Sequence, residues 1–163
     1  MKIEAIKIKN NSHSRWVKQQ AFTMIELMVA MAIVGIMSAI AIPSYQQYVM
    51  KSRRVAAITT LLDMASREER FYTSQNTYSI LPSDIGYGTG SSVPSPSAAN
   101  NYYTVSVATA SVTCGITSCY TLQAVPVAGS TQAKDAECGT FTYTSTGIKS
   151  QTGTGSLKSC WKS

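Results

Sequence analysis

Residues 21–42 read AFTMIELMVAMAIVGIMSAIAI, and from Phe22 to Ile42 this stretch contains one charged residue, Glu26. As a helix that rises about 1.5 Å per residue, the 21 residues from Phe22 to Ile42 would just cross a hydrocarbon layer of about 30 Å. Leu, Met, Ala and Ile dominate the composition and favour a helix. The sequence therefore predicts a membrane-spanning helix over residues 22–42.

A basic, polar leader precedes this helix. Its net charge over residues 1–20 is 5 − 1 = +4, out of +6 for all 163 residues. The basic residues are Lys2, Lys7, Lys9, Arg15 and Lys18, against Glu4. Because basic flanks stay on the cytoplasmic side, we expect a cytoplasmic leader over residues 1–21 and a translocated C-terminal part.

Three basic residues beyond the far end of the helix, Lys51, Arg53 and Arg54, favour the opposite orientation. They weigh less, because long domains cross a membrane largely regardless of nearby charge. The four cysteines that follow also suit an oxidising compartment.

Glu26 needs a partner or a route to water, because a carboxylate at the centre of a membrane helix costs roughly 2.5–3.5 kcal/mol, and less near an interface. One interpretation is that it snorkels to the head groups. The other is that it pairs with a new N-terminal amine, created by cleavage between Ala21 and Phe22, one helical turn earlier. Between neighbouring chains, such a pair would also set an axial register for assembly.

The segment Ala21–Val29 resembles the processing and assembly motif of type IV pilins (the type IVa prepilin family) and of the related type II secretion pseudopilins. The resemblance implies that a prepilin peptidase cleaves between Ala21 and Phe22 and N-methylates Phe22. The family usually has Gly where this chain has Ala21. Glu26 corresponds to the carboxylate used in subunit docking, and Pro43 also matches the family.

This resemblance implies an α+β pilin fold, in which a long N-terminal helix, membrane-spanning in its first half, packs on a C-terminal antiparallel sheet of about four strands. Residues 137–143 together with Cys160 and Trp161 look most like minor pilins of the PilE type. The expected function is that of a minor pilin, a structural subunit of a type IV pilus for twitching motility and adhesion, with DNA uptake as an additional role.

The expected partners are other pilin subunits, the prepilin peptidase and the pilus assembly machinery of the inner membrane. The chain would be a single-pass inner-membrane protein with a periplasmic head, and afterwards part of a cell-surface pilus. Alternatives are a DNA-binding minor pilin of a competence pilus and a pseudopilin of a type II secretion system. An ordinary signal peptide cut after Ala39-Ile40-Ala41 is a further alternative, which Glu26 and the length of the apolar run disfavour.

Residues 43–76 predict the amphipathic half of the same helix, with Pro43 as a site of kinking and an end near Thr73 to Asn76. Its predicted apolar stripe, which we expect to pack on the sheet, comprises Val55, Ile58, Leu62, Ala65 and Tyr72. Lys51, Arg53, Arg67, Glu68 and Arg70 are expected mostly off that stripe.

Residues 77–100 are rich in Pro, Gly and Ser and predict a connecting loop, packed on the sheet by Tyr78, Ile80, Leu81 and Tyr87. Residues 101–163 predict the antiparallel sheet and a disulfide-closed C-terminal loop. The expected strands are Tyr102–Ala108, Tyr120–Val127, Thr140–Ser145 and Ile148–Ser150, and Leu157–Trp161 is expected to pair as a late strand.

The four cysteines allow three disulfide connectivities, and the sequence does not choose among them. We favour Cys138 with Cys160, which closes a C-terminal loop as pilins commonly do, and Cys114 with Cys119, which would staple a turn between strands. A zinc site is disfavoured, since the chain has no C-x-x-C pair and no histidine downstream of the leader.

We expect no enzyme, no cofactor and no metal. His13 is the one histidine and lies in the leader, so Ser/His/Asp and Cys/His nucleophile systems are excluded from the processed chain. No P-loop or GxGxxG motif is present. For the DNA-binding alternative, the candidate contacts are Lys149, Lys158 and Lys162, near the aromatic residues Tyr143 and Trp161.

Overall fold

The computed structural model describes residues 22–88, 90–97, 99–108 and 115–162 of the chain. The chain divides into two compact units, one that ends at Ile40 and one that begins at Ala41. The helix α1 (Met24–Gln75) contributes to both units. The predicted leader, residues 1–21, and the predicted disulfide residue Cys114 lie outside the described residues.

The described part of the first unit is the beginning of α1. Thr23 caps the helix, because its Oγ1 accepts a hydrogen bond from the backbone N–H of Glu26 at 3.3 Å. Ser38 donates to the carbonyl oxygen of Val34 at 2.7 Å, within the helix. Among the described residues of this unit, no apolar side chain is buried, so this stretch of α1 has no core of its own.

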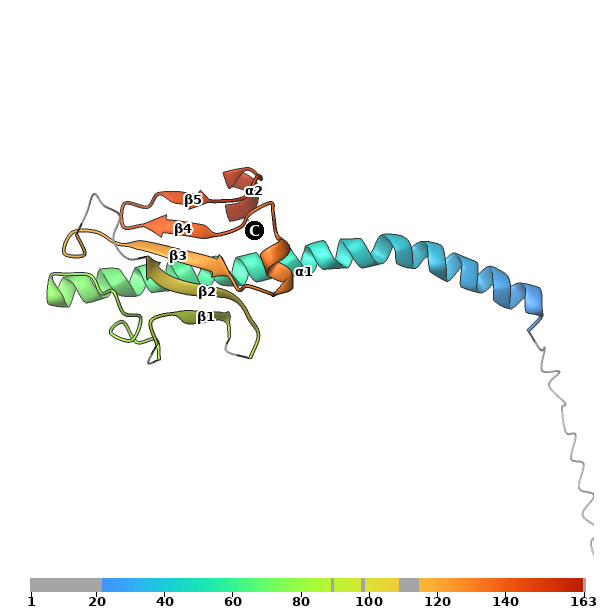
Figure 1. Cartoon of the computed structure of the whole chain (residues 1–163), viewed down its shortest axis with the longest axis horizontal. Coiled ribbons are helices and arrows are strands. Elements are labelled where there is room, and N and C mark those ends of the chain that lie inside the picture. Colours follow the sequence, from blue (N-terminus) through green and yellow to red (C-terminus); the bar gives the residue numbers. More distant parts are fainter. Residues whose placement is uncertain (1–21, 89, 98, 109–114, 163) are drawn as a thin grey trace, which may run out of the picture. The chain divides into compact units, whose positions relative to one another are not determined.

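The second unit contains a five-stranded antiparallel sheet that lies on the later part of α1 (Figure 1). Its strands, hydrogen-bonded in chain order, are β1 (Val93–Pro96), β2 (Asn101–Ala108), β3 (Thr121–Pro126), β4 (Phe141–Thr144) and β5 (Lys149–Gln151). A 3-10 turn, η1 (Thr131–Lys134), precedes β4, and a short helix, α2 (Leu157–Trp161), follows β5. The predicted α+β class and long N-terminal helix are confirmed, with five strands in place of about four.

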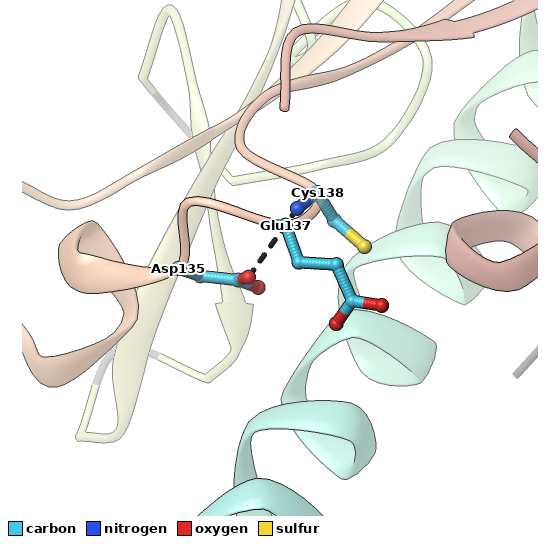
Figure 2. A group of neighbouring side chains, drawn as sticks. All are labelled: Asp135, Glu137 and Cys138. Carbon is cyan, nitrogen blue, oxygen red and sulfur yellow. Dashed lines mark hydrogen bonds between the residues drawn. The ribbon is translucent and has the colours of Figure 1, made fainter. Parts of the chain in front are cut away.

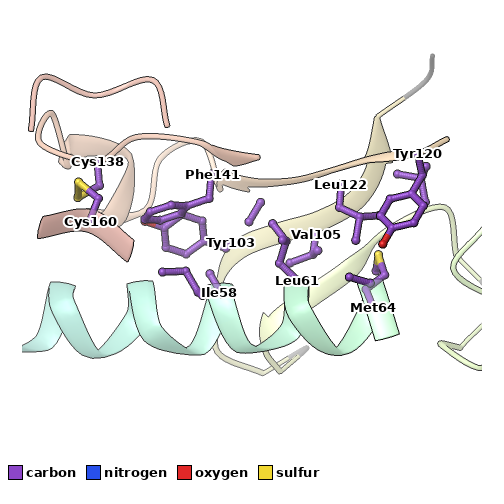
Figure 3. Close-up of a cluster of buried hydrophobic side chains, with 14 of the residues drawn as sticks. Ile58, Leu61, Met64, Tyr103, Val105, Tyr120, Leu122, Cys138, Phe141 and Cys160 are labelled. Atoms are coloured by element: carbon purple, nitrogen blue, oxygen red, sulfur yellow. A yellow bond between two sulfur atoms is a disulfide. The ribbon is translucent and has the colours of Figure 1, made fainter. Parts of the chain in front are cut away.

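The core lies between one face of α1 and the inner face of this sheet. Figure 3 shows Ile58, Leu61 and Met64 of α1 pointing at side chains of the sheet. The facing residues alternate along the strands, as a half-buried sheet requires, and include Tyr103, Val105, Leu122 and Phe141. Each such large side chain contributes about 1.5–3 kcal/mol when it is fully buried. These contacts hold the sheet on the helix.

The helix ends where polar residues gather, as predicted. Its last residue is Gln75, and Asn76 follows with φ of 55°. This left-handed conformation lets the N–H of Asn76 donate to the carbonyl oxygen of Tyr72 at 2.8 Å, which satisfies one terminal carbonyl.

Two secondary-structure predictions were wrong. Residues 77–100 contain the edge strand β1, which the prolines Pro94 and Pro96 concealed. Proline cannot donate to a ladder, but an edge strand tolerates it. Residues Leu157–Trp161 form the helix α2 and not a late strand, because Ser156 caps this segment by accepting from the N–H of Ser159 at 3.1 Å.

The predicted apolar stripe of α1 was only partly correct. Ile58 and Ala65 are buried, but Val55 and Leu62 are each 38% exposed. The buried face consists of Arg54, Ala57, Ile58, Leu61, Met64, Ala65 and Glu68. This face begins and ends with a charged residue, Arg54 and Glu68. The expectation that Glu68 lies off the buried face was wrong, and Arg54 was interpreted only as a basic flank of the membrane helix.

The loop after α1 was also only partly as expected. Tyr78 and Tyr87 pack against the core, whereas Ile80 and Leu81 are exposed. Tyr78 stacks on Tyr72 with ring centroids 4.6 Å apart.

Candidate functional site

The apolar surface of α1 is the first functional feature. Among the described residues, α1 is the helix that is long and apolar enough to cross a membrane. None of its most apolar 18-residue stretch is buried within the chain. The stretch presents large side chains such as Met24, Ile36 and Ile40 to the outside, at 81%, 67% and 72% exposure. Soluble monomers rarely expose an apolar patch of this extent, and such a patch marks a surface that contacts lipid or other proteins.

Glu26 is the one acidic residue on this surface and sits in the first turn of α1. A carboxylate there interacts favourably with the partial positive charge of the helix N-terminus. Among the described residues, none forms an ion pair with Glu26. Pro43 lies within α1, just after the apolar stretch.

A buried ionic cluster joins α1 to the segment before β4. The guanidinium of Arg54 donates to both carboxylate oxygens of Asp135, each at 2.6 Å, and to Glu137 at 2.9 Å. Burial alone lowers the pKa of Arg54, but the hydrogen bonds and charges of Asp135 and Glu137 outweigh it, so this pKa is raised above its ordinary value. Gln132 extends the cluster by donating to Asp135 at 2.9 Å and to the Tyr103 hydroxyl at 3.1 Å.

The same carboxylates belong to a group that could in principle hold a metal ion. Figure 2 shows Asp135, Glu137 and Cys138 close together. The atoms of theirs that could bind a metal lie within 4.8 Å of one another. The Cys138 sulfur is already committed, because it forms a disulfide with Cys160. Both carboxylates already accept hydrogen bonds from Arg54, which supplies the positive charge that a metal would bring. The cluster is therefore a structural ion pair and not a metal centre.

The Cys138–Cys160 disulfide closes the C-terminal loop with a sequence separation of 22, as predicted. The loop runs back against its own start. A Cβ at Gly153 would lie 2.2 Å from the carbonyl oxygen of Glu137, and one at Gly155 would lie 2.8 Å from it. These glycines are required because the two backbones touch. The pairing of Cys114 with Cys119 stays a prediction, since Cys114 lies outside the described residues.

Of the three lysines predicted to contact DNA, Lys149 lies beside Trp161. Lys149 of β5 places its Nζ 5.3 Å from the Trp161 ring centroid, and Tyr143 lies 6.4 Å from it between centroids. Trp161 is itself held by a hydrogen bond from Nε1 to the carbonyl oxygen of Ser150 at 3.1 Å. Lys158 lies in α2 and Lys162 is its C-cap residue. All three lysines are exposed.

Glu68 is a buried acid that lacks a cationic partner among the described residues. One carboxylate oxygen accepts from the N–H of Ser79 at 3.0 Å, and the other has no hydrogen-bond partner. Burial raises the pKa of Glu68, the Ser79 N–H lowers it, and the charges of Asp84 and Glu69 raise it further. This carboxyl fastens the loop after α1 to the helix.

Sequence reasoning therefore missed the buried polar residues. Arg54 was interpreted as a flanking charge, Glu68 as a solvent-facing one, and Asp135 and Gln132 were not singled out. Gln132 and Asp135 lie three positions apart, but the other partners are 11 to 83 positions away in sequence, so no local pattern could have identified the cluster or the contact of Glu68.

Comparison with protein families places these features in context. Residues 43–142 match the family described as "Type IV minor pilin ComP, DNA uptake sequence receptor". Residues 16–42 match the prokaryotic N-terminal methylation motif. The second match covers the apolar stretch and the predicted cleavage site, and the first covers most of the head.

Individual relatives agree with these families. The chain is 34% identical to the type IV major pilin protein PilA of Myxococcus xanthus (strain DK1622) over 92 residues, covering 56% of this chain and 39% of that protein. It is 39% identical to a fimbrial protein of Pseudomonas aeruginosa over 75 residues, covering 42% and 49%. The chain therefore spans less than half the length of these curated relatives. A solved structure, the non-core minor pilin PilV of Neisseria meningitidis, matches with a TM-score of 0.44 and 22% identity, over 67% of this chain and 92% of that one.

Proposed function

This chain belongs to the type IV minor pilin family whose model matches residues 43–142, and from this we propose that it is a minor subunit of a type IV pilus, held in the inner membrane until it is assembled into the filament. The leader is removed between Ala21 and Phe22 by a prepilin peptidase, and Phe22 is then N-methylated. The match of residues 16–42 to the N-terminal methylation motif supports this processing. The subunit is not an enzyme. The pilus that it helps to build serves twitching motility and adhesion, and other proteins supply the energy for filament extension.

The observation that carries the proposal is the uncovered apolar surface at the start of α1. Its large side chains are exposed in the isolated chain, and each would gain about 1.5–3 kcal/mol on full burial. The membrane covers this surface before assembly, and the helices of neighbouring subunits cover it in the filament.

Glu26 gives the assembly its register. After cleavage, the amine of Phe22 stands four residues before Glu26, which is about 6 Å along a helix. In a low-dielectric helix bundle an unpaired carboxylate is costly, so the amine of a neighbouring subunit is its favoured partner. This pairing is satisfied at one axial offset between neighbouring helices.

The fold of the head supports the orientation with the leader in the cytoplasm. Arg54 is buried and ion-paired with Asp135. Arg53 donates to the Thr131 hydroxyl and lies over the Tyr102 ring, 3.6 Å from its centroid. Arg53 and Arg54, two of the three basic residues whose position favours the opposite orientation, therefore make contacts within the folded part of the chain. Five basic residues of the leader then dominate the charge asymmetry.

The register role is tested with Glu26→Ala and Glu26→Lys, and with Glu26→Gln, which removes the charge but keeps the shape. We expect all three to be processed to the Phe22 N-terminus and to remain in the membrane, as mass measurement and membrane fractionation would report. They should be absent from sheared pili. Normal incorporation of the Ala and Lys variants would refute the register role.

A second function, DNA binding during uptake, is favoured by the description of the matching family as a DNA uptake sequence receptor. We propose that the exposed lysines Lys149, Lys158 and Lys162 contact phosphates, with Trp161 as a stacking surface beside them. These residues lie beyond residue 142, where the family match ends.

The test is a DNA mobility shift by the full chain in mild detergent at several salt concentrations. Replacing the three lysines by Gln should weaken binding and reduce the slope of log affinity against log salt by about 0.9 for each phosphate that is no longer neutralised. Arg70→Gln, which removes one exposed basic residue of α1, is the control. An absence of binding by the wild-type chain at low salt would reject DNA recognition, and an unchanged slope in the triple variant would reject this surface.

A further inference from the structure

The end of the head where η1 meets α1 carries two adjacent hollows with a lysine between them. One, of about 400 Å³, is lined by Gln47, Met50, Lys51, Arg54 and residues 134–137. The other, of about 430 Å³, is lined by Tyr45, Gln46, Val49, Met50, Arg53, Thr131 and Lys134. Lys134 and Met50 belong to both. We call these two hollows and their lining residues the basal surface.

The basal surface has a net positive charge. Its basic residues are Lys51, Arg53, Arg54 and Lys134, and its acids are Asp135 and Glu137, which gives 4 − 2 = +2. Both acids accept hydrogen bonds from Arg54; Asp135 is buried, and the Glu137 side chain is half exposed. Lys51 and Lys134 form no ion pair among the described residues, and both are exposed. Two cations are therefore available to an anionic ligand.

Two exposed tyrosines of α1 mark this surface: Tyr45 lines one hollow, and Tyr48 lies one helical turn further along α1. Tyr45 and Tyr48 are 69% and 72% exposed, and they are the first aromatic residues after the apolar stretch that ends at Ile42. Tyr and Trp are enriched at the boundary between hydrocarbon and water, where the ring is buried and the hydroxyl is wet. Their position favours a lipid head-group layer as the occupant.

The spacing along α1 agrees with that occupant. At about 1.5 Å per residue, Tyr45 and Tyr48 stand roughly 5 and 9 Å beyond Ile42, and Lys51 roughly 14 Å. The head-group layer is about 5–8 Å thick on each side of the hydrocarbon, so the backbone of Tyr45 falls within it, whereas Tyr48 and Lys51 start just beyond it and contact it through their side chains. Helical side chains point toward the N-terminus, so the long Lys51 side chain reaches back toward that layer.

We propose that the basal surface binds the phosphates of anionic phospholipids in the membrane that α1 spans, through Lys51 and Lys134, with Tyr45 and Tyr48 in the head-group layer. The proposal rests on the membrane insertion argued above. It assigns to these lysines a contact with the membrane in the unassembled subunit, which must be broken when the subunit leaves for the filament.

The test uses the full chain in vesicles of phosphatidylcholine alone, or with about 30% phosphatidylglycerol. Flotation first reports whether the chain inserts. A membrane-impermeant acylating reagent then modifies lysines, and mass spectrometry compares Lys51 and Lys134 with Lys149 and Lys158 in the same molecules. Because this is a ratio within one chain, mixed orientations do not affect it.

We expect Lys51 and Lys134 to be acylated roughly fivefold more slowly, relative to the two reference lysines, in the anionic vesicles than in the neutral ones at low salt. The reason is that the anionic lipid surface attracts and covers their ammonium groups. About 0.5 M salt should remove the difference, because it shortens the screening length. Failure to float would overturn both insertion and the lipid contact. Flotation with equal ratios in both vesicles would overturn the lipid contact alone.

Two further experiments test whether the ligand is a lipid and whether Lys51 and Lys134 bind it. Inorganic phosphate added to the neutral vesicles should not reproduce the protection, and if it did so fully the lipid assignment would be wrong.

In the variant Lys51→Gln/Lys134→Gln, residues 44–54 should lose any phosphatidylglycerol-dependent slowing of amide hydrogen exchange. Lys149→Gln/Lys158→Gln is the matched control and should keep it, whereas loss in both pairs would contradict the proposal.

Discussion

Arg54 and Asp135 form a bidentate ion pair, with both nitrogen–oxygen distances at 2.6 Å, across 81 positions of sequence. Both side chains are almost fully buried, at 5% and 1% exposure. The pair ties α1 to the segment that leads into the Cys138–Cys160 disulfide, and so it sets where the C-terminal loop begins.

Breaking this pair from one side should be strongly destabilising. Arg54→Met leaves the Asp135 carboxylate buried without its cation, which typically costs about 3–5 kcal/mol. The double variant Arg54→Met/Asp135→Leu should recover much of that loss, because no charge is then stranded. Thermal unfolding of the full chain in mild detergent, followed by circular dichroism, measures both. Arg70→Met, at an exposed site, is the control and should change stability by about 0.5 kcal/mol or less. Equal effects of Arg54→Met and Arg70→Met would contradict the assignment.

Removing the Cys138–Cys160 disulfide should destabilise the head by about 3 kcal/mol, since the closed loop is 22 residues long. The double variant Cys138→Ala/Cys160→Ala removes it without leaving one unpaired thiol. The expected readout is a lower unfolding temperature with little change in the helical signal of α1. An unchanged unfolding temperature would show that the disulfide adds nothing to the folded head.

Gly153→Ala should lower stability by about 1–3 kcal/mol, as overpacking does, because the new Cβ would sit 2.2 Å from the Glu137 carbonyl oxygen. Backbone surrounds it, and backbone cannot move aside cheaply. Gly90→Ala is the matched control, since its nearest contact is 3.4 Å away. If both variants melted together with the wild type, residues 152–155 would not pack on residue 137 as described.

Glu68→Gln should remove a pH dependence of stability. The pKa of Glu68 is raised by burial in the folded chain, so the stability it contributes is full below its ordinary pKa of 4.5 and is lost as the pH rises through the folded-state pKa. Asp63 acts in the opposite sense, because the hydrogen bond from Tyr87 lowers its pKa, and its contribution is lost as the pH falls. The difference between wild type and Glu68→Gln, measured by thermal unfolding at several pH values, isolates Glu68. A difference that does not vary with pH would reject the raised pKa.

Much of the architecture could be read directly from local patterns. An apolar stretch of spanning length followed by an amphipathic pattern predicts α1, and alternation predicts β2, β3 and β4 within a residue or two at each end. These signals are local because they depend on the repeat of a single element. The short element α2 was missed because a cap at Ser156 outweighed its strand-like composition.

The amino-acid sequence was sufficient for the anchor helix, for the exclusion of histidine-based catalysis and for the likeness to pilins, because each depends on residue types and spacings within one segment. The burial of Arg54 and Glu68, the strand at Val93–Pro96 and the hollows beside Lys134 emerged only when distant segments came together. A buried charge is stable only beside its partner, and an edge strand only beside its neighbour. Where that partner lies far along the chain, the packed structure, and no local pattern, determines which face of a helix is the inside.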